Sequence, residues 1–302
     1  MIDNCQPEFS VIIASYNRRQ TLKLVLAKFR EISFPSLEII VVDNASMDNT
    51  TQVLKDKFKE VKLIRLEKNL GYEAYNIGLG VAKGKYIIMM DNDAFLKEDA
   101  LQRLIKRFSD ESDIDAIAMN IMIYGTNISE TEGWQEDTPN FHGAAVAIRR
   151  EVLDKVGGYD RDYFIMHTDL ELATRILNRG YRIVYDDKII CYHLRSEKAR
   201  LKTTSIYYST RNAFFYYWKY YPLFYALQLS GREIIYGFMR GVREKSLYAY
   251  FKGLGDGIFS IPRTFKKRTP LKKEIYLRLR RYLDTYFREP LIRKVFSKLR
   301  SG

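Results

Sequence analysis

The sequence KYIIMMDND, residues 85–93, joins a short apolar run to an acidic turn, and it decides the fold class. The run is too short for an ordinary helix and therefore predicts a buried β-strand. Three similar runs precede it, FSVIIA at 9–14, EIIVVD at 38–43 and VKLIRL at 61–66, with helical patterns between them at 18–31, 48–58 and 74–83. Strands that alternate with helices predict an α/β protein with a mostly parallel, Rossmann-like sheet flanked by helices.

Polar clusters follow three of these strands. They read SYNR at 15–18, DNASMD at 43–48 and DND at 91–93. Ligands of parallel α/β sheets bind at the carboxyl ends of the strands, where the loops converge. We therefore expect the three clusters to share one rim and to form the functional site.

The remaining sequence falls into two regions. Residues 141–195 continue the α/β pattern with FHGAAVAIRR, a helix over 169–179 and the strands RIVYD and IICYH, whereas the chain after 196 is aromatic, basic and helical in pattern over 207–260 and 272–299. Residues 1–195 hold 26 basic and 30 acidic side chains, and residues 196–302 hold 24 and 7, giving net charges of about −4 and +17. The predicted domains are an α/β domain at 1–195 and a basic helical region at 196–302.

Composition excludes several classes of protein. With 302 residues, 46% of them hydrophobic, the chain can bury a core, so it is not a disordered or fibrous protein. Its two cysteines, Cys5 and Cys191, cannot form a disulfide framework, and we expect a cytoplasmic protein. We expect neither a signal peptide nor a spanning helix, because Lys219 and Pro222 interrupt the longest aromatic run.

Candidate ligand-binding residues lie in the polar clusters. Asp91 and Asp93, at i and i+2, could converge on a divalent cation that also holds phosphates, or they could form an acidic turn that opens a helix. Asp43 could accept a hydrogen bond from a uracil- or thymine-like N–H, or it could, with Asp48, cap the next helix. Arg18 could reach a diphosphate or lie on a solvated helix face.

Several stretches together resemble the inverting, nucleotide-sugar-dependent glycosyltransferases of family two, which have the GT-A fold. They span 9–193 in family order: SVIIASYNR, IIVVDNASMDNT, NLGYEAYNIGLGVAKGKYIIMMDND, GAAVAIRREVLDKVGGYD, TDLELATRILNRGY and CYH. A later stretch, YYSTRNAFFYYWKYYP, resembles the rhamnosyltransferase-like branch. The resemblance implies Mg²⁺ or Mn²⁺ as cofactor and a nucleoside diphosphate sugar as donor, with UDP or dTDP favoured by Asp43.

The resemblance also implies roles for single residues. Asp93 would hold the metal ion on the diphosphate, helped by Asp91 and by His193 at the end of the last strand, although a lone histidine there is more often structural. Asp91 would also contact the ribose or sugar. The other residues implied in nucleotide-sugar binding are Ala14, Tyr16, Arg18, Asp43, Asn69, Gly71 and Asn76, the last of which falls one residue closer to Asn69 than the common pattern.

The catalytic base implied by the resemblance is Asp169. It would take a proton from an acceptor hydroxyl during one in-line displacement that inverts the anomeric carbon. The family has Glu-Asp here, whereas this chain has Thr168 before Asp169 and a further acid at Glu171. Residues 168–171 also match a capping box, and the two interpretations can coexist.

The sequence is also compatible with other functions. A sugar-phosphate nucleotidyltransferase would need a glycine-rich basic loop after the first strand, and a dehydrogenase would need G-x-G-x-x-G, where this chain has SYNR. A binding module that has lost activity stays open, because Thr168 replaces the family glutamate.

The region 196–302 has three possible partners. Its charge and aromatic residues suit an anionic membrane surface at the inner face of the cell membrane, where a lipid-linked or glycan-precursor acceptor would be delivered. They equally suit a helical core or a homo-oligomer interface with a solvated basic face. Nucleic acid is disfavoured, because no nucleic-acid-binding motif accompanies the charge.

Overall fold

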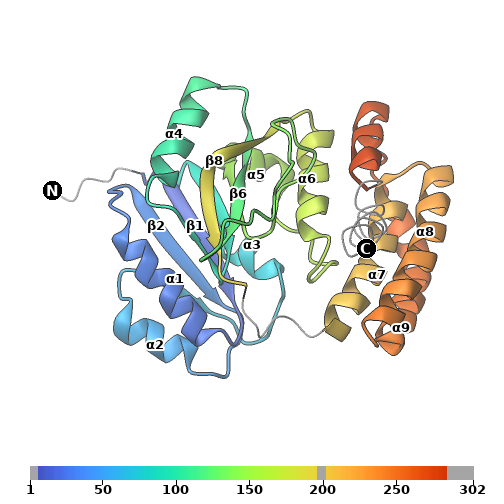
Figure 1. Cartoon of the computed structure of the whole chain (residues 1–302), viewed down its shortest axis with the longest axis horizontal. Coiled ribbons are helices and arrows are strands. Elements are labelled where there is room, and N and C mark those ends of the chain that lie inside the picture. Colours follow the sequence, from blue (N-terminus) through green and yellow to red (C-terminus); the bar gives the residue numbers. More distant parts are fainter. Residues whose placement is uncertain (1–5, 196–201, 284–302) are drawn as a thin grey trace, which may run out of the picture. The chain divides into compact units, whose positions relative to one another are not determined.

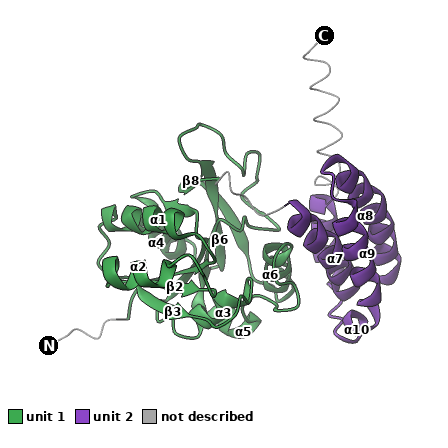
Figure 2. Cartoon of the chain, turned by 90° about the horizontal axis from the view of Figure 1, so that it is seen from below, with its two compact units in different colours: residues 1–199 green, residues 200–302 purple. Residues whose placement is uncertain are grey.

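The computed structural model describes residues 6–195 and 202–283 (Figure 1). The chain divides into two compact units, residues 1–199 and 200–302, which Figure 2 colours separately. Cys5 and the predicted helix beyond residue 283 lie outside the described residues.

Unit 1 is built on one eight-stranded sheet with the strand order β3-β2-β1-β4-β7-β6-β8-β5. The strands are β1 (Phe9–Ser15), β2 (Leu37–Asp43), β3 (Lys62–Arg65), β4 (Tyr86–Asp91), β5 (Ala94–Leu96), β6 (Ala116–Ile123), β7 (Ala145–Arg149) and β8 (Ile183–His193). The four strands predicted first are confirmed as β1 to β4, and they pair in parallel. The whole sheet is mixed, because β7 pairs antiparallel with β4 and β6, and β5 pairs antiparallel with β8. The predicted strands RIVYD and IICYH are one strand, β8.

Helices cover both faces of this sheet (Figure 1). They are α1 (Arg19–Glu31), α2 (Thr50–Lys57), α3 (Glu73–Leu79), α4 (Ala100–Asp110), α5 (Arg150–Val156) and α6 (Thr168–Asn178). Helices α1, α2 and α4 bury their apolar stripes in a core cluster with the strands; in α1 the stripe is Leu22, Val25, Leu26 and Phe29. On the opposite face α3 lies directly on β1, because a Cβ atom at Gly78 would stand 2.4 Å from Cγ2 of Ile12.

The strand order places the site. Strand β1 pairs with β2 on one side and with β4 on the other, so the order reverses at β1, the place where such sheets bind ligands. The register sets Ser15 beside Asp43 and Ala14 beside Asp91, so the polar clusters share one edge as predicted.

Unit 2 is helical, as predicted. It contains α7 (Lys202–Tyr220), α8 (Leu223–Arg243), α9 (Leu247–Phe259) and α10 (Ile261–Lys266), and residues 273–283 are also helical. Its core is rich in buried tyrosines: Tyr216, Tyr217, Tyr220, Tyr221 and Tyr250. Within the described ranges, no helix combines the length and the apolar character needed to cross a bilayer.

Candidate active site

The loops after β1 and β2 are bonded to each other. The backbone N–H of Asn17 donates to Oγ of Ser46 at 2.9 Å, and Oδ1 of Asn17 accepts from the N–H of Met47 at 2.8 Å. Asn17 itself has a φ of 52°, a left-handed conformation that asparagine tolerates well. Tyr16 and Arg18 therefore lie on a turn at the edge of the sheet that is held in place by hydrogen bonds. The side chain of Tyr16 is 40% exposed.

Asp43 ends β2 and is completely buried. Its Oδ1 accepts from the N–H of Ser46 at 2.9 Å, and its Oδ2 accepts from Arg65 at 3.2 Å and from the hydroxyl of Thr51. These contacts make Asp43 a support of its own loop. Its contact with a nucleobase N–H stays a prediction.

The turn at 69–71 is held from two sides. The side-chain amide of Asn44 donates to the carbonyl of Gly71 at 3.0 Å, and Oδ1 of Asn69 accepts from the N–H of Gly71 at 2.9 Å. Gly71 has a φ of 61°, and a Cβ atom there would stand 2.2 Å from the carbonyl oxygen of Phe164. That carbonyl accepts the N–H of Tyr72 at 2.7 Å, so this turn and the loop before α6 are directly joined.

Three tyrosines connect Asp91 with Asp169. The rings of Tyr72, Tyr75 and Tyr159 pack with centroids 5.0–5.4 Å apart. The hydroxyls of Tyr72 and Tyr75 lie 3.3 and 3.2 Å from Oδ1 of Asp91, and the hydroxyl of Tyr159 lies 3.4 Å from Oδ1 of Asp169. Burial, reinforced by the two carboxylates, raises the pKa of Tyr75 and Tyr159 well above 10, so both phenols stay protonated as donors.

Asp169 lies in the first turn of α6, against the backbone of Gly143. A Cβ atom at Gly143 would stand 2.7 Å from Oδ2 of Asp169 and 3.2 Å from the hydroxyl of Tyr72. The helix begins at Thr168 after His167, whose φ is 61° and whose side chain makes no capping bond. The capping-box interpretation is therefore wrong, because Thr168 is not the N-cap residue.

Glu171, the later acidic residue of this turn, serves the fold. It is completely buried, and Arg175 donates to it through Nε at 2.9 Å and Nη2 at 2.8 Å. The same guanidinium donates to the carbonyls of residues 156–158 at 2.6–3.3 Å. The pair thereby fixes the Gly157-Gly158 turn to α6.

Asn76 has a supporting contact in the structure, and its role in nucleotide-sugar binding stays a prediction. Its amide donates to the carbonyl of Tyr159 at 2.8 Å and accepts the N–H of Tyr159 at 2.8 Å. Both ends of the amide are thus used to hold Tyr159 against α3.

Asp93 and His193 meet because β5 pairs antiparallel with β8. Nε2 of His193 lies 3.4 Å from Oδ1 of Asp93, and Nδ1 lies 2.5 Å from Glu130. Burial lowers the pKa of His193, but hydrogen bonds with Asp93 and Glu130 outweigh it and raise that pKa to about 10. Burial opposes ionisation of Glu130 and Asp93, yet the bonds to His193 lower both pKa values, that of Glu130 to about 2, and Arg18 contributes at Asp93.

This arrangement fits a divalent cation held partly by substrate. Among residues 6–195 and 202–283, no three His, Cys, Asp or Glu side chains are placed as a ready metal site. Mg²⁺ in phosphate-transfer and related sites is commonly held by one or two carboxylates together with phosphate oxygens. Asp93 would supply one donor and His193 an adjacent one once a cation displaced the proton on its Nε2, and Glu130 at Nδ1 would orient the imidazole as outer partners of metal-bound histidines do.

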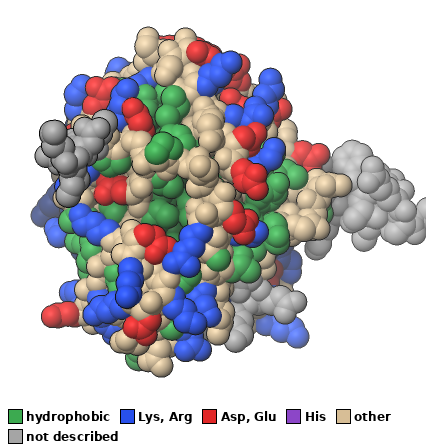
Figure 3. Space-filling model, turned by 90° about the vertical axis from the view of Figure 1, so that its left-hand side faces the viewer, with side chains coloured by type: hydrophobic (Ala, Val, Ile, Leu, Met, Phe, Trp, Pro, Cys, Tyr) green, Lys and Arg blue, Asp and Glu red, His purple; other side chains and the backbone are tan. Residues whose placement is uncertain are grey.

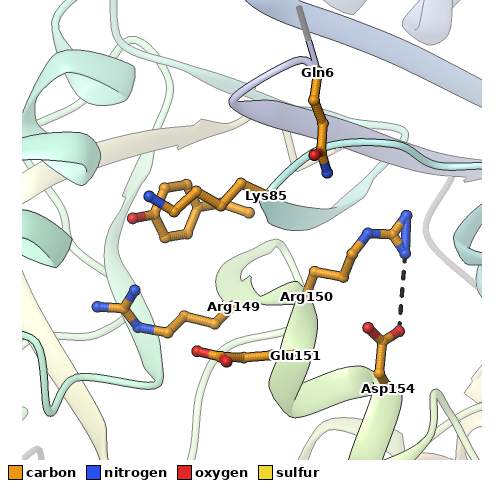
Figure 4. A pocket seen from close by; sticks show the side chains of 7 residues that line it. Gln6, Lys85, Arg149, Arg150, Glu151 and Asp154 are labelled. Carbon is orange, nitrogen blue, oxygen red and sulfur yellow. Dashed lines mark ion pairs between the residues drawn. The ribbon is translucent and has the colours of Figure 1, made fainter.

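A separate cleft of about 250 Å³ lies around the amino end of β4 and the carboxyl end of β7 (Figure 4). Its lining residues are Gln6, Lys85, Tyr86, Arg149, Arg150, Glu151 and Asp154. Arg149 donates to the carbonyls of Ile114 and Phe108, and Arg150 donates to that of Gly84. These arginines therefore bind the chain's own backbone, and the cleft lies at the edge opposite the polar clusters.

The structure thus joins the predicted residues into two groups, Asp91 with Asp169 and Asp93 with His193. Sequence reasoning missed the three tyrosines and Glu130. The spacing of Tyr72 and Tyr75, three residues apart at the start of a helix, is a signal that could have found them. Glu130 has no comparable signal, since it lies in an irregular segment between β6 and β7.

Solved structures with this architecture define the class of fold. TarS from S. aureus, residues 1–349 in complex with UDP-GlcNAc, matches with a TM-score of 0.61 at 18% identity, over 86% of this chain and 84% of that one. The mannosyltransferase PcManGT from Pyrobaculum calidifontis, in complex with GDP-Man and Mn²⁺, matches with a TM-score of 0.55 at 20% identity, over 87% and 74%. The fold is that of the GT-A glycosyltransferases.

Sequence comparison then gives the family. The model of the family described as "Glycosyl transferase family 2" matches residues 10–167, and the chain belongs to this family. A poly-beta-1,6-N-acetyl-D-glucosamine synthase of Staphylococcus epidermidis is 24% identical over 208 residues, which are 62% of this chain and 50% of that protein. The chain therefore spans about half the length of the curated relatives it matches. Membership of the rhamnosyltransferase-like branch stays a prediction.

Proposed function

We propose that this chain transfers a sugar from a nucleoside diphosphate sugar to an acceptor hydroxyl, with inversion at the anomeric carbon. The observation that carries the proposal is the approach of Asp91 and Asp169 to one tyrosine cluster at the carboxyl edge of the sheet. A donor sugar held at Asp91 would face a carboxylate on the first turn of α6. Family membership supports the reaction class.

Asp169 is the proposed catalytic base. Its position at a helix N-terminus favours the carboxylate, and the Tyr159 hydroxyl orients it. Asp169 would take the acceptor proton as the new glycosidic bond forms and the bond to the diphosphate breaks.

Asp93 and His193 are the proposed holders of Mg²⁺ or Mn²⁺, with Asp91 nearby on the same turn. The bound ion would stabilise the charge of the departing diphosphate, as PcManGT's Mn²⁺ complex suggests for a relative of this fold. Arg18, whose charge already acts on Asp93, would add to that stabilisation.

Ala14, Tyr16, Asp43, Asn69 and Gly71 form the proposed nucleotide side of the site. We favour a UDP- or dTDP-linked sugar, and UDP-GlcNAc is the first donor to test, since TarS was solved with it. The proposed acceptor is a lipid-linked or glycan precursor, because a polysaccharide synthase is among the relatives. We also propose a peripheral location at the inner face of the membrane.

A donor screen tests the proposal. UDP-, dTDP- and GDP-sugars are incubated with the full chain and Mn²⁺, Mg²⁺ or EDTA, and released nucleoside diphosphate and donor-induced thermal stabilisation are measured. We expect one donor class to bind and turn over. Binding without any turnover, with or without a panel of acceptors, would instead favour a module that has lost activity.

Asp169→Asn tests the base. We expect it to lower the transfer rate by about two or more orders of magnitude while donor affinity is kept, because positioned base catalysis typically contributes about 10²–10⁴-fold. Asp154→Asn, a substitution on the exposed side of α5, is the matched control. Near-normal transfer by Asp169→Asn would remove this residue from the role.

Asp93→Ala tests the cation site. We expect calorimetry to show that Mn²⁺ no longer increases donor affinity. Equal affinities with and without Mn²⁺ in the unsubstituted chain would refute the metal assignment and leave the base assignment standing.

A further inference from the structure

Helix α8 buries small and polar residues and exposes large apolar ones, the reverse of the usual arrangement. Its buried face consists of small or polar residues, with one leucine: Ala226, Leu229, Ser230, Glu233, Gly237 and Gly241. Its opposite face carries large apolar side chains that are 43–72% exposed: Phe224, Leu227, Ile235, Phe238 and Val242. These five positions recur at intervals that place them on one side of a helix. A helix of a water-soluble bundle normally buries such a stripe.

The inversion follows from how α8 packs on α9. A Cβ atom at Gly237 would stand 2.9 Å from the ring of Tyr250, and one at Gly241 would stand 3.1 Å from Cβ of the same tyrosine. The hydroxyl of Tyr250 donates to the carbonyl of Ile234 at 2.8 Å. Small residues at these positions let the two helices approach closely.

The exposed stripe continues onto α9. Phe251, which is 56% exposed, has its ring centroid 6.2 Å from that of Phe238. We call Phe224, Leu227, Ile235, Phe238 and Val242 of α8 together with Phe251 of α9 the apolar face. Apolar patches of this kind on soluble chains usually mark interaction sites.

The unit that carries the apolar face is strongly basic. Residues 202–283 contain 17 Lys and Arg against four acidic residues. Three of those four acids are already paired: Glu233 with Arg240, Glu244 with Lys202, and Asp256 with Lys252. On the face of the molecule drawn in Figure 3, by contrast, acidic and basic side chains are interspersed.

We propose that the apolar face of α8 and α9 docks onto a bilayer surface that bears anionic lipid, with the helices lying in the interface. Helices that present aromatic and aliphatic side chains bind in this way, and Lys and Arg strengthen their binding to anionic lipid. The positive charge of unit 2 favours a bilayer over a second copy of the chain as the partner of this face. Two apolar faces in contact would bring two strongly positive units together. Anionic headgroups attract them, by about 1 kcal/mol for each basic residue near the surface.

Vesicle flotation tests the docking without any sugar donor, so its outcome is separate from that of the proposed transferase. We expect the full chain to float with phosphatidylcholine vesicles that contain phosphatidylserine and to float less with phosphatidylcholine alone. The double variant Phe224→Ser, Ile235→Ser should bind at least about tenfold more weakly, because two large side chains no longer enter the interface. Leu24→Ser, at a 43% exposed leucine of α1, is the matched control and should bind as the unsubstituted chain does.

A fluorescence probe reports on the face itself. In Phe224→Trp we expect vesicles to shift tryptophan emission to shorter wavelength and brominated lipid to quench it, with the two native tryptophans measured in the parent chain as background. Unchanged flotation of the double variant would overturn the proposal, since charge alone would then hold the chain. The proposal would also be overturned if the unsubstituted chain did not bind the vesicles. This holds if the chain is a monomer, and equally if it is a dimer that the double variant converts to a monomer.

Discussion

Gly143→Ala would introduce one methyl group between the two halves of the proposed site. The added Cβ would stand 2.7 Å from Oδ2 of Asp169, about 0.7 Å inside the 3.4 Å at which ordinary contact begins, and 3.2 Å from the hydroxyl of Tyr72. Gly143 does not have a positive φ, so alanine is compatible with the backbone and the strain falls on the carboxylate. The substitution therefore displaces the proposed base with little change to the fold.

The expected magnitude follows from that displacement. Misplacing a reacting group by about 1 Å can cost about 10²-fold, so a shift of about 0.7 Å predicts a 10- to 100-fold loss of kcat, equivalent to about 1.4–2.7 kcal/mol of barrier. Donor affinity, measured by calorimetry, should change less than kcat, because the added methyl group meets the Asp169 carboxylate directly and reaches Asp91 only through the hydroxyl of Tyr72. Gly80→Ala is the control, since its Cβ would meet its nearest atoms at 3.6 Å. Unchanged kcat in Gly143→Ala, with Asp169→Asn inactive, would refute the placement of the Asp169 carboxylate against Gly143.

Two further predictions concern buried charges. Arg175→Met should lower the free energy of unfolding by about 3–5 kcal/mol in urea denaturation, because it leaves Glu171 buried without its ion-pair partner. Adding Glu171→Leu to that variant should recover most of the loss. A double variant in which the two losses simply add would contradict this. Burial, only partly offset by Arg240, raises the pKa of Glu233 from its ordinary 4.5 to about 7. Its contribution to stability is therefore complete below about pH 4.5 and is lost as the pH rises through 7, by up to about 3 kcal/mol. Thermal unfolding between pH 5 and pH 8 should show a smaller decline in Glu233→Gln, and equal declines would contradict the assignment.

The sequence predicts those strands of the sheet that depend only on neighbouring residues in the chain. Four of the predicted runs form β1, β2, β3 and β4. Each is β-branched or apolar over four to seven residues and is bounded by polar loops, so each strand can be predicted from its own residues alone. The antiparallel strand β7 could not be oriented this way, because its direction depends on pairing with β4 and β6, far away in the chain.

The same distinction between local and long-range information applies to the candidate site. The convergence of Asp43 and Asp91 on one edge follows from parallel pairing, which periodicity reveals. The bond between Tyr159 and Asp169 and the ion pair of Glu130 with His193 depend on loop conformations that no periodicity encodes. Asn76 and Asp43 show the same limit, because residue type does not reveal that both side chains are bonded to the chain's own atoms. Their part in donor binding stays a prediction.

The link between Tyr72 and Phe164 has a consequence for how this site could diverge. The amide of Tyr72 is bonded to Phe164 while its hydroxyl contacts Asp91, and the adjoining Gly71 tolerates no side chain. The spacing between Asp91 and the helix that carries Asp169 is therefore fixed by the backbone itself. Changes elsewhere in the loops can be accepted only if they leave this link, and the contact of Glu130 with His193, in place.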